Sequence, residues 1–177
     1  MSSGNGTAER HDDQTFVLVT VGSTGFDDLV RAVDSIAPTL DVTGMAQIGP
    51  GDYVPSNLPY ERFVPTLSEL IDRADVVVSH GGAATTLEAL SAGAKLVSVA
   101  NPDRYDDHQN DVLSELSSQG HLVWCRDLAR IGDDIHQALT TDMKPIDTVE
   151  CTIGETINDY LSRQPKRRLP WQRKVTS

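Results

Sequence analysis

The 177-residue sequence is poor in aromatic residues, which make up 5% of it, and it has two cysteines and no apolar run long enough to span a membrane. Cys125 and Cys151 fit no metal-ligand spacing, so we expect free thiols. The polar residues 1–14 lack the pattern of a secretory signal, and we expect them to form a disordered leader. These absences predict a cytoplasmic protein without disulfides or membrane spans.

Basic residues are also scarce, and the formal net charge is −11. A chain this acidic is not expected to bind nucleic acid. Six of the 15 Lys and Arg residues lie in residues 163–177, which contain no acidic residue. This basic tail is either a disordered end or a segment that touches an anionic membrane or an acidic partner. The excess of Asp over Glu suits a halophile's solvated surface, and an acidic mesophilic protein fits it equally well.

Short apolar runs alternate with segments of helical periodicity over residues 15–162, which we expect to form one domain. Strands are predicted at residues 16–21, 42–48, 61–65, 75–79, 95–100 and 121–125. Helices are predicted at residues 26–36, 66–74, 83–93, 109–120, 130–140 and 149–162, with Pro38 stopping the first. The alternation predicts right-handed β-α-β units and therefore an α/β fold, a Rossmann-like parallel sheet with helices on both faces.

Three glycine-rich or polar loops follow predicted strands, at residues 22–25, 79–82 and 101–109. In a parallel sheet, ligands bind outside the carboxyl ends of the strands. We therefore expect these three loops to lie on one rim of the sheet and to form the ligand site.

The segment SHGGAATTLE, residues 79–88, carries the clearest chemical signal. Gly81 and Gly82 allow a tight turn after a buried strand and leave the start of the next helix uncovered. A helix start with free N–H groups and a partial positive charge is a ready anion site. The groups expected to hold a diphosphate are the backbone amides near Gly82, Ala83 and Ala84 and the hydroxyl of Thr85.

Glu88 lies about two turns into the same helix, and its carboxylate could accept two hydrogen bonds from a ribose diol. A helix rise of ~9 Å keeps this carboxylate away from the phosphates. His80 could act as a catalytic base, but a single His without a partner is more often structural or a ligand contact. Gly22 and Ser23 fit neither a P-loop nor a dinucleotide motif, and they either contact a phosphate or sugar or form an ordinary turn.

Asp103, Asp106, Asp107 and His108 look at first like a metal cluster. Adjacent ligands on a flexible loop make a poor all-protein metal site, and an acidic protein can carry such residues as a solvated loop. The alternative is that His108 and Gln109, at the start of a helix on the ligand rim, recognise sugar hydroxyls. We favour sugar recognition and expect no metal site.

Three segments, in this order and spacing, resemble one family. The segments are VTVGSTGFDDLVRAV, VVVSHGGAATTLEALSAGAKLVSVANPDRYDDHQND and QGHLVWC. Over residues 16–128 they resemble the catalytic subunit of the two-component UDP-N-acetylglucosamine transferase of lipid-linked oligosaccharide synthesis and its bacterial capsule-polysaccharide counterparts. More distantly, they resemble the C-terminal half of the bacterial lipid II glycosyltransferase. These proteins share the glycosyltransferase family 28 C-terminal domain.

The resemblance implies the C-terminal, donor-binding half of a GT-B glycosyltransferase. It implies that the helix start at residues 82–85 binds the diphosphate of a UDP-sugar and that Glu88 binds the ribose. It assigns donor-sugar contacts to His108 and Gln109. It also implies that the loop of Gly22 and Ser23 faces the cleft and that the backbone of the turns at residues 63–66 holds the uracil. Transfer in such enzymes is metal-independent, so we expect no cofactor besides the UDP-sugar donor.

A GT-B active site lies between two domains, and this chain supplies one of them. The resemblance implies a heterodimer with a membrane-anchored subunit that binds a lipid-linked acceptor, supplies the general base and holds this chain on the cytosolic face of a membrane. The donor sugar it implies is N-acetylglucosamine, although galactose, glucose or a uronic acid would use much the same rim. Two other classes stay open: a non-catalytic sugar-nucleotide-binding subunit, and a sugar-nucleotide epimerase, which normally needs both domains in one chain.

Overall fold

A computed structural model of the chain describes residues 14–40, 42–102 and 108–146. Residues as far as Pro145 make up one compact unit. The expected leader, the helix expected at residues 149–162, the basic tail and the aspartates of the 103–107 loop lie outside the described residues. The domain bounds 15–162 therefore stay a prediction.

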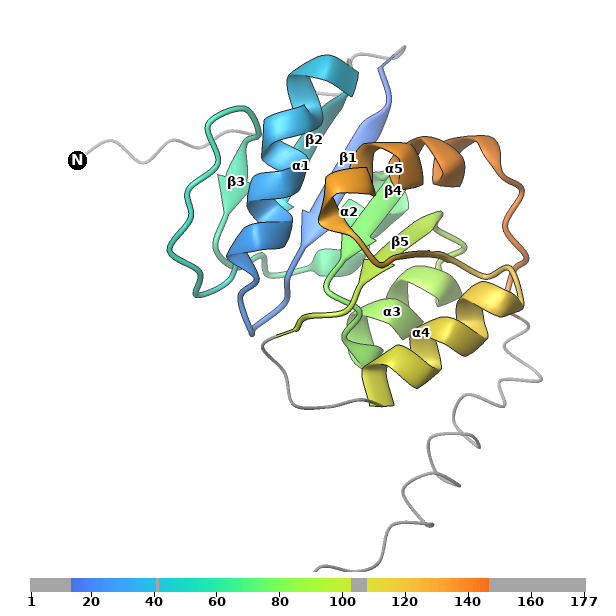
Figure 1. Cartoon of the computed structure of the whole chain (residues 1–177). Coiled ribbons are helices and arrows are strands. Elements are labelled where there is room, and N and C mark those ends of the chain that lie inside the picture. Colours follow the sequence, from blue (N-terminus) through green and yellow to red (C-terminus); the bar gives the residue numbers. More distant parts are fainter. Residues whose placement is uncertain (1–13, 41, 103–107, 147–177) are drawn as a thin grey trace, which may run out of the picture. The chain divides into compact units, whose positions relative to one another are not determined.

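The described part contains a single sheet of six parallel strands (Figure 1). The strands are β1 (Phe16–Thr20), β2 (Thr43–Gln47), β3 (Tyr60–Glu61), β4 (Val76–Ser79), β5 (Leu96–Val99) and β6 (Val123–Cys125). Their order is β3-β2-β1-β4-β5-β6, so the direction of chain crossover reverses between β1 and β4. The predicted parallel α/β sheet is thereby confirmed, and ligands of such sheets bind at this reversal point.

Helices cover both faces of the sheet (Figure 1). They are α1 (Asp27–Leu40), α2 (Leu67–Arg73), α3 (Ala83–Ser91), α4 (His108–Ser118) and α5 (Ile131–Thr140), with a 3₁₀ turn at Leu128–Arg130. Helices α1 and α5 contact each other and pack on one face, while α2, α3 and α4 lie on the other. The predicted strand-helix alternation over the described residues is confirmed.

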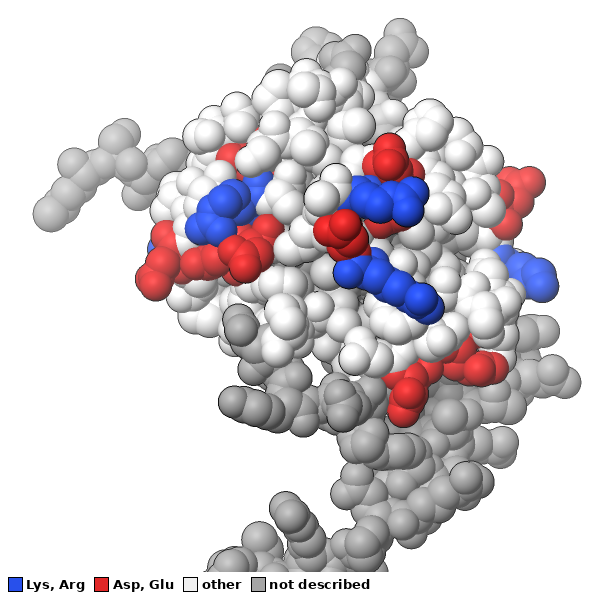
Figure 2. Space-filling view, in the orientation of Figure 1, with Lys and Arg blue, Asp and Glu red and all other residues white. Residues whose placement is uncertain are grey.

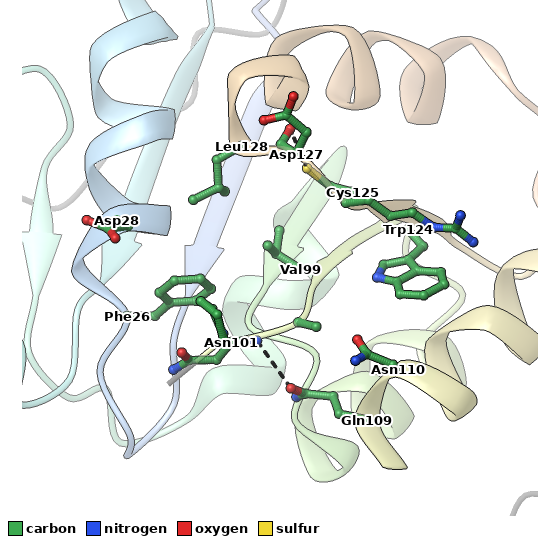
Figure 3. A pocket seen from close by; sticks show the side chains of 13 residues that line it. Phe26, Asp28, Val99, Asn101, Gln109, Asn110, Trp124, Cys125, Asp127 and Leu128 are labelled. Carbon is green, nitrogen blue, oxygen red and sulfur yellow. Dashed lines mark hydrogen bonds between the residues drawn. The ribbon is translucent and has the colours of Figure 1, made fainter. Parts of the chain in front are cut away.

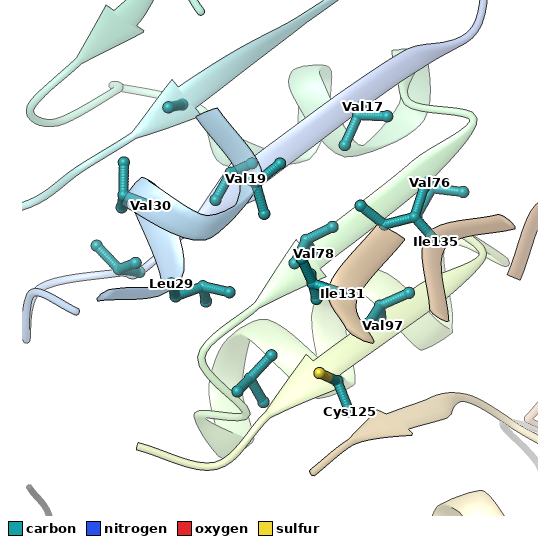
Figure 4. Packing of buried hydrophobic residues seen from close by; sticks show 14 of the residues in the cluster. Val17, Val19, Leu29, Val30, Val76, Val78, Val97, Cys125, Ile131 and Ile135 are labelled. Carbon is teal, nitrogen blue, oxygen red and sulfur yellow. The ribbon is translucent and has the colours of Figure 1, made fainter. Parts of the chain in front are cut away.

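The core between the sheet and the α1–α5 layer is built from alternate strand residues (Figure 4). Val17 and Val19 of β1 and Val76 and Val78 of β4 pack toward Leu29 and Val30 of α1 and Ile131 and Ile135 of α5. The intervening residues Leu18 and Val77 point to the opposite face and are fully buried as well. Burial on both faces explains why these strands are continuous apolar runs in the sequence.

Pro38 lies inside α1, which runs on to Leu40, so the prediction that Pro38 stops this helix was wrong. Proline has no N–H and leaves the carbonyl four residues earlier, that of Asp34, without its helical donor. The side chain of Asn57 donates to this carbonyl at 3.0 Å. A distant loop residue thus replaces the missing bond. The strand expected at residues 61–65 is also shorter and earlier, at Tyr60–Glu61.

Charged side chains of both signs are interspersed on the face seen in Figure 2, and the described residues there form no basic patch. None of the helices in the described part is long and apolar enough to cross a membrane.

Candidate functional site

The loops after β1, β4 and β5 leave the same rim of the sheet, as the sequence predicts, because all the strands run parallel. The first two loops meet at the reversal point between β1 and β4. Each turns through a glycine in the left-handed region, Gly22 at φ +62° and Gly81 at φ +70°. Residues with a Cβ rarely adopt this conformation, which explains why glycine stands at both turns.

Helix α3 begins beside this reversal point and is uncapped. Its N-cap residue is Gly82, no side chain accepts a hydrogen bond there, and the first turn contains no acidic residue. Ala83 and Ala84 are exposed, and Thr85 is buried in the same turn. The first-turn N–H groups therefore face the rim with their partial positive charge uncompensated, which is the geometry of an anion site.

Glu88 lies on the exposed face of α3, one turn beyond Ala84. Side chains in a helix lean toward its N-terminus, so the Glu88 carboxylate lies over the turn that begins at Ala84. It makes no hydrogen bond with any described residue. The carboxylate is thus available to a ligand bound at the helix start.

The ring of His80 lies between the two turns and is 8% exposed. A Cβ built on Gly22 would stand 3.0 Å from the His80 Cε1 atom, and a Cβ on Gly82 would overlap Nε2. His80 therefore requires glycine on both sides, and its Nε2 faces the start of α3. Its catalytic role stays a prediction.

Gln109 of α4 joins the loops after β4 and β5. Its Nε2 donates to the carbonyl oxygen of His80 at 2.9 Å, and its Oε1 accepts from the N–H of Asn101 at 3.2 Å (Figure 3). This leaves one N–H and one lone pair of the carboxamide for a ligand. His108 begins α4 as expected, and its side chain lies outside the description.

A pocket of about 760 Å³ opens beside Gln109 (Figure 3). Its walls come from the start of α1, the loop after β5, the start of α4 and the end of β6. The aromatic and amide side chains that line it are those of Phe26, Asn101, Gln109, Asn110 and Trp124. Aromatic rings together with amides suit a hydroxyl-rich ligand such as a sugar, and Asp28, Arg126 and Asp127 add charged groups to the walls. Sequence reasoning named Gln109 and missed the others. Phe26 and Trp124 lie in elements that it read as fold alone, and Asn101 and Asn110 lie in the expected ligand-site loop and at the helix start beside it without being named.

Cys125 lies at the inner end of this pocket and is buried. Burial, a hydrogen bond with Asp134 and the charge of that carboxylate raise the pKa of the Cys125 thiol to about 12. A thiol of this kind stays protonated at neutral pH and is a poor nucleophile. No group of three or more His, Cys, Asp or Glu residues within the described ranges is arranged to hold a metal ion.

Gln47 was not identified from the sequence. It ends β2, is 3% exposed, and uses its carboxamide in bonds to Thr20, Gly22 and Arg62. A polar residue at the carboxyl end of a buried strand is the signal that could have found it, because that end faces the ligand rim.

Two carboxylates of α1 hold the loop between β2 and β3. Sequence reasoning also missed this role of the two carboxylates. Asp27 accepts from the N–H groups of Asp52 and Tyr53, each at 3.1 Å. Asp34, which is 1% exposed, accepts from the N–H groups of residues 56, 57 and 58 at 2.8–3.0 Å and from the Tyr53 hydroxyl at 2.8 Å. Burial raises the pKa of Asp34, but these hydrogen bonds together lower it below its ordinary value of 3.8.

Comparison with protein families gives a match to the glycosyltransferase family 28 C-terminal domain over residues 16–155. The human UDP-N-acetylglucosamine transferase subunit ALG13 is 36% identical over 122 residues, which cover 62% of this chain and 11% of the human protein. The chain therefore matches only about a tenth of that relative's length.

Solved structures share the fold. The glycosyltransferase of kitacinnamycin has a TM-score of 0.62 at 21% identity, covering 80% of this chain and 39% of its own. The solution structure of ALG13 has a TM-score of 0.58 at 16% identity, covering 81% of this chain and 94% of its own. The predicted equivalence to one half of a GT-B glycosyltransferase is confirmed at the level of the fold.

Proposed function

The chain belongs to the glycosyltransferase family 28 C-terminal domain family, and from this premise we propose that it is the donor-binding, catalytic subunit of a heteromeric inverting glycosyltransferase. The donor is a UDP-sugar. N-acetylglucosamine is the favoured sugar because the similar human protein is named a UDP-N-acetylglucosamine transferase subunit. The acceptor is lipid-linked and is held by a membrane-anchored partner, which places this chain on the cytosolic face of the membrane.

One observation carries the proposal: the uncapped start of α3 lies at the reversal point of the sheet, with Glu88 free on the same helix. The amides of Ala83 and Ala84 bind the diphosphate, and the Glu88 carboxylate accepts hydrogen bonds from the ribose diol. As the glycosidic bond breaks, negative charge grows on the departing UDP. The helix dipole and the free N–H groups stabilise this charge, so the transfer needs no metal ion.

The pocket beside Gln109 suits the donor sugar. The exposed Asn110 and the remaining hydrogen-bonding capacity of Gln109 are directed groups for hydroxyls. The half-buried ring of Trp124, with the Arg126 guanidinium 4.1 Å from its centroid, is the aromatic group beside them. Phe63, which follows β3 and is 60% exposed, is a stacking surface for the uracil.

Inverting transfer also requires a base that takes the proton of the acceptor hydroxyl. His80 is the candidate within this chain, and a residue of the partner subunit is the alternative. The relatives' name supports a partner, because it calls ALG13 a subunit.

Calorimetric titration of the full chain with UDP, with and without EDTA, tests the proposal. UDP should bind equally well in both buffers. Glu88→Ala should weaken binding at least about tenfold, because a hydrogen bond to a charged group contributes about 1.5–3 kcal/mol. Glu69→Ala removes an exposed carboxylate from α2 and is the matched control, with no expected change in affinity.

A panel of UDP-sugars then identifies the sugar, and His108→Ala should alter discrimination among sugars more than affinity for UDP. If UDP does not bind, even with the partner subunit co-expressed, the donor-subunit proposal is wrong. If UDP-sugars bind but the complex transfers no sugar, the chain is a non-catalytic nucleotide-binding subunit.

A further inference from the structure

Gln47 uses its whole carboxamide as a bridge between two loops of the rim. Its Oε1 accepts from the Gly22 N–H at 2.9 Å and from the Thr20 hydroxyl at 2.7 Å. Its Nε2 donates to the Gly22 carbonyl at 2.9 Å and to the Arg62 carbonyl at 2.7 Å. The reversed amide would place oxygen against two carbonyls, so the orientation of this buried side chain is fixed by its partners.

The two loops it joins lie on opposite sides of β2. Gly22 forms the turn after β1, where its left-handed backbone packs against the ring of His80. Arg62 immediately precedes Phe63, and its guanidinium donates to the carbonyls of Gly49 and Gly51. Gln47 therefore ties the backbone next to the α3 start to the backbone next to Phe63.

We propose that Gln47 is a positioning residue that sets the separation between the diphosphate-binding and the base-binding parts of the site. This inference rests on the proposed function, in which one UDP molecule contacts both parts. A ligand that spans two loops binds tightly only if both already stand at the right distance, because ordering them on binding costs free energy. Gln47 touches neither the diphosphate nor the base in this proposal and acts through Gly22 and Arg62.

Gln47→Met tests the proposal, because Met has a similar length and removes all four hydrogen bonds without burying a charge. Binding of UDP should weaken about tenfold or more, because the loops must then be ordered by the ligand. Uracil and inorganic pyrophosphate, each of which contacts only one of the two parts in the proposed site, should weaken by no more than about twofold on the same reasoning. Kd values for all three come from NMR titration of the full chain.

Lys95→Met is the control, since it removes a side-chain hydrogen bond to the Leu139 carbonyl at the end of the sheet opposite the rim. It should leave all three affinities unchanged. If Gln47→Met does not fold, Gln47→Asn keeps a carboxamide but is one methylene shorter, so that it cannot reach both Gly22 and Arg62. Unchanged UDP affinity in a folded variant, or equal weakening of UDP, uracil and pyrophosphate, overturns the proposal, because neither outcome fits a role in spacing.

Amide hydrogen exchange gives a readout that needs no ligand. Gly49 donates to the Arg62 carbonyl, so its amide reports the second loop, while the Gly22 amide reports the first. In Gln47→Met both amides should exchange faster together, and in Lys95→Met neither should. Acceleration of only one amide overturns the bridging role. Failure of the wild-type chain and its complex to bind UDP would instead refute the proposed function, and the exchange result would still decide whether Gln47 couples the loops.

Discussion

Backbone N–H groups that have no backbone partner gather at two places in the described part of the chain, the start of α3 and the loop between β2 and β3. Side chains accept from these groups at only one of the two places. In the loop, Asp27 and Asp34 accept from five backbone N–H groups. At the start of α3, no side chain caps the helix and no acidic residue lies in the first turn.

The difference separates a structural use of backbone N–H groups from the ligand-binding use that we propose. Where the chain supplies its own carboxylates, the N–H groups are satisfied internally and the loop is fixed on α1. Where it supplies none, the same groups are left for an anion from outside. An uncapped helix start costs stability, and its position at the reversal point of the sheet gives that cost a functional explanation.

Removal of the Asp34 carboxylate should have the largest effect, which is on the stability of the fold. Asp34→Ala leaves several buried donors unsatisfied and should lower the free energy of unfolding by roughly 3–5 kcal/mol. Urea denaturation measures the loss. UDP affinity should be unchanged wherever the variant is folded, and a fall in affinity would mean that the loop and the α3 start are not independent.

A carboxylate added at the start of α3 should satisfy its N–H groups internally, as Asp27 and Asp34 do in the loop between β2 and β3. Ala84→Asp places a carboxylate in the exposed first turn of α3, which should stabilise the fold by about 0.3–1 kcal/mol through the helix dipole. The same charge should repel the diphosphate and weaken UDP binding about tenfold or more.

Ser91→Asp is the matched control at the other end of α3. It adds the same charge at an exposed position, should not stabilise the helix, and should leave UDP binding unchanged. Equal loss of affinity in both variants would indicate general charge repulsion rather than a local anion site.

The smallest expected effect is a pH dependence of the stability that Asp34 contributes through the loop between β2 and β3. The folded pKa of Asp34 is lowered, so its contribution to stability is complete above the unfolded pKa and is lost as pH falls through the folded value. The difference in urea midpoint between wild type and Asp34→Asn should therefore be constant near neutral pH and shrink below about pH 4. A difference that grows as the pH falls below about 4 would contradict the lowered pKa, because that change has the sign of a raised pKa.

The features that could be predicted from the sequence are those that depend on neighbouring residues. Strands such as Val76–Ser79 are short apolar runs because both faces of the sheet are buried, and α3 ends at Ser91, two residues before Gly93, whose φ of +73° few other residues adopt. The shared rim of the three loops followed from parallel strands alone. The uncapped start of α3 was predicted because a helix cap comes from residues adjacent in the sequence, and the N-cap residue Gly82 has no side chain to supply one.

The features that were missed depend on partners far away in the sequence. The helix continues past Pro38 only because Asn57 bonds to the freed carbonyl. Asp34 and Gln47 are ordinary polar residues by composition, and they matter because they bind loops that lie 15 to 25 residues away in the sequence. The pocket combines the start of α1 with the end of β6, which no local pattern can bring together.

The bond from Gln109 to the His80 carbonyl has a consequence for the order of events during synthesis. The rim needs Gly22 from the first loop and Gln109 from the fourth helix, and chains emerge from the ribosome N-terminus first, at about 5–20 residues per second. Several seconds therefore separate the two residues, while β1 and β4 can already pair. The loops of the rim are completed late in translation, and a nascent chain that stops short of α4 has the central strands of the sheet but not the finished site.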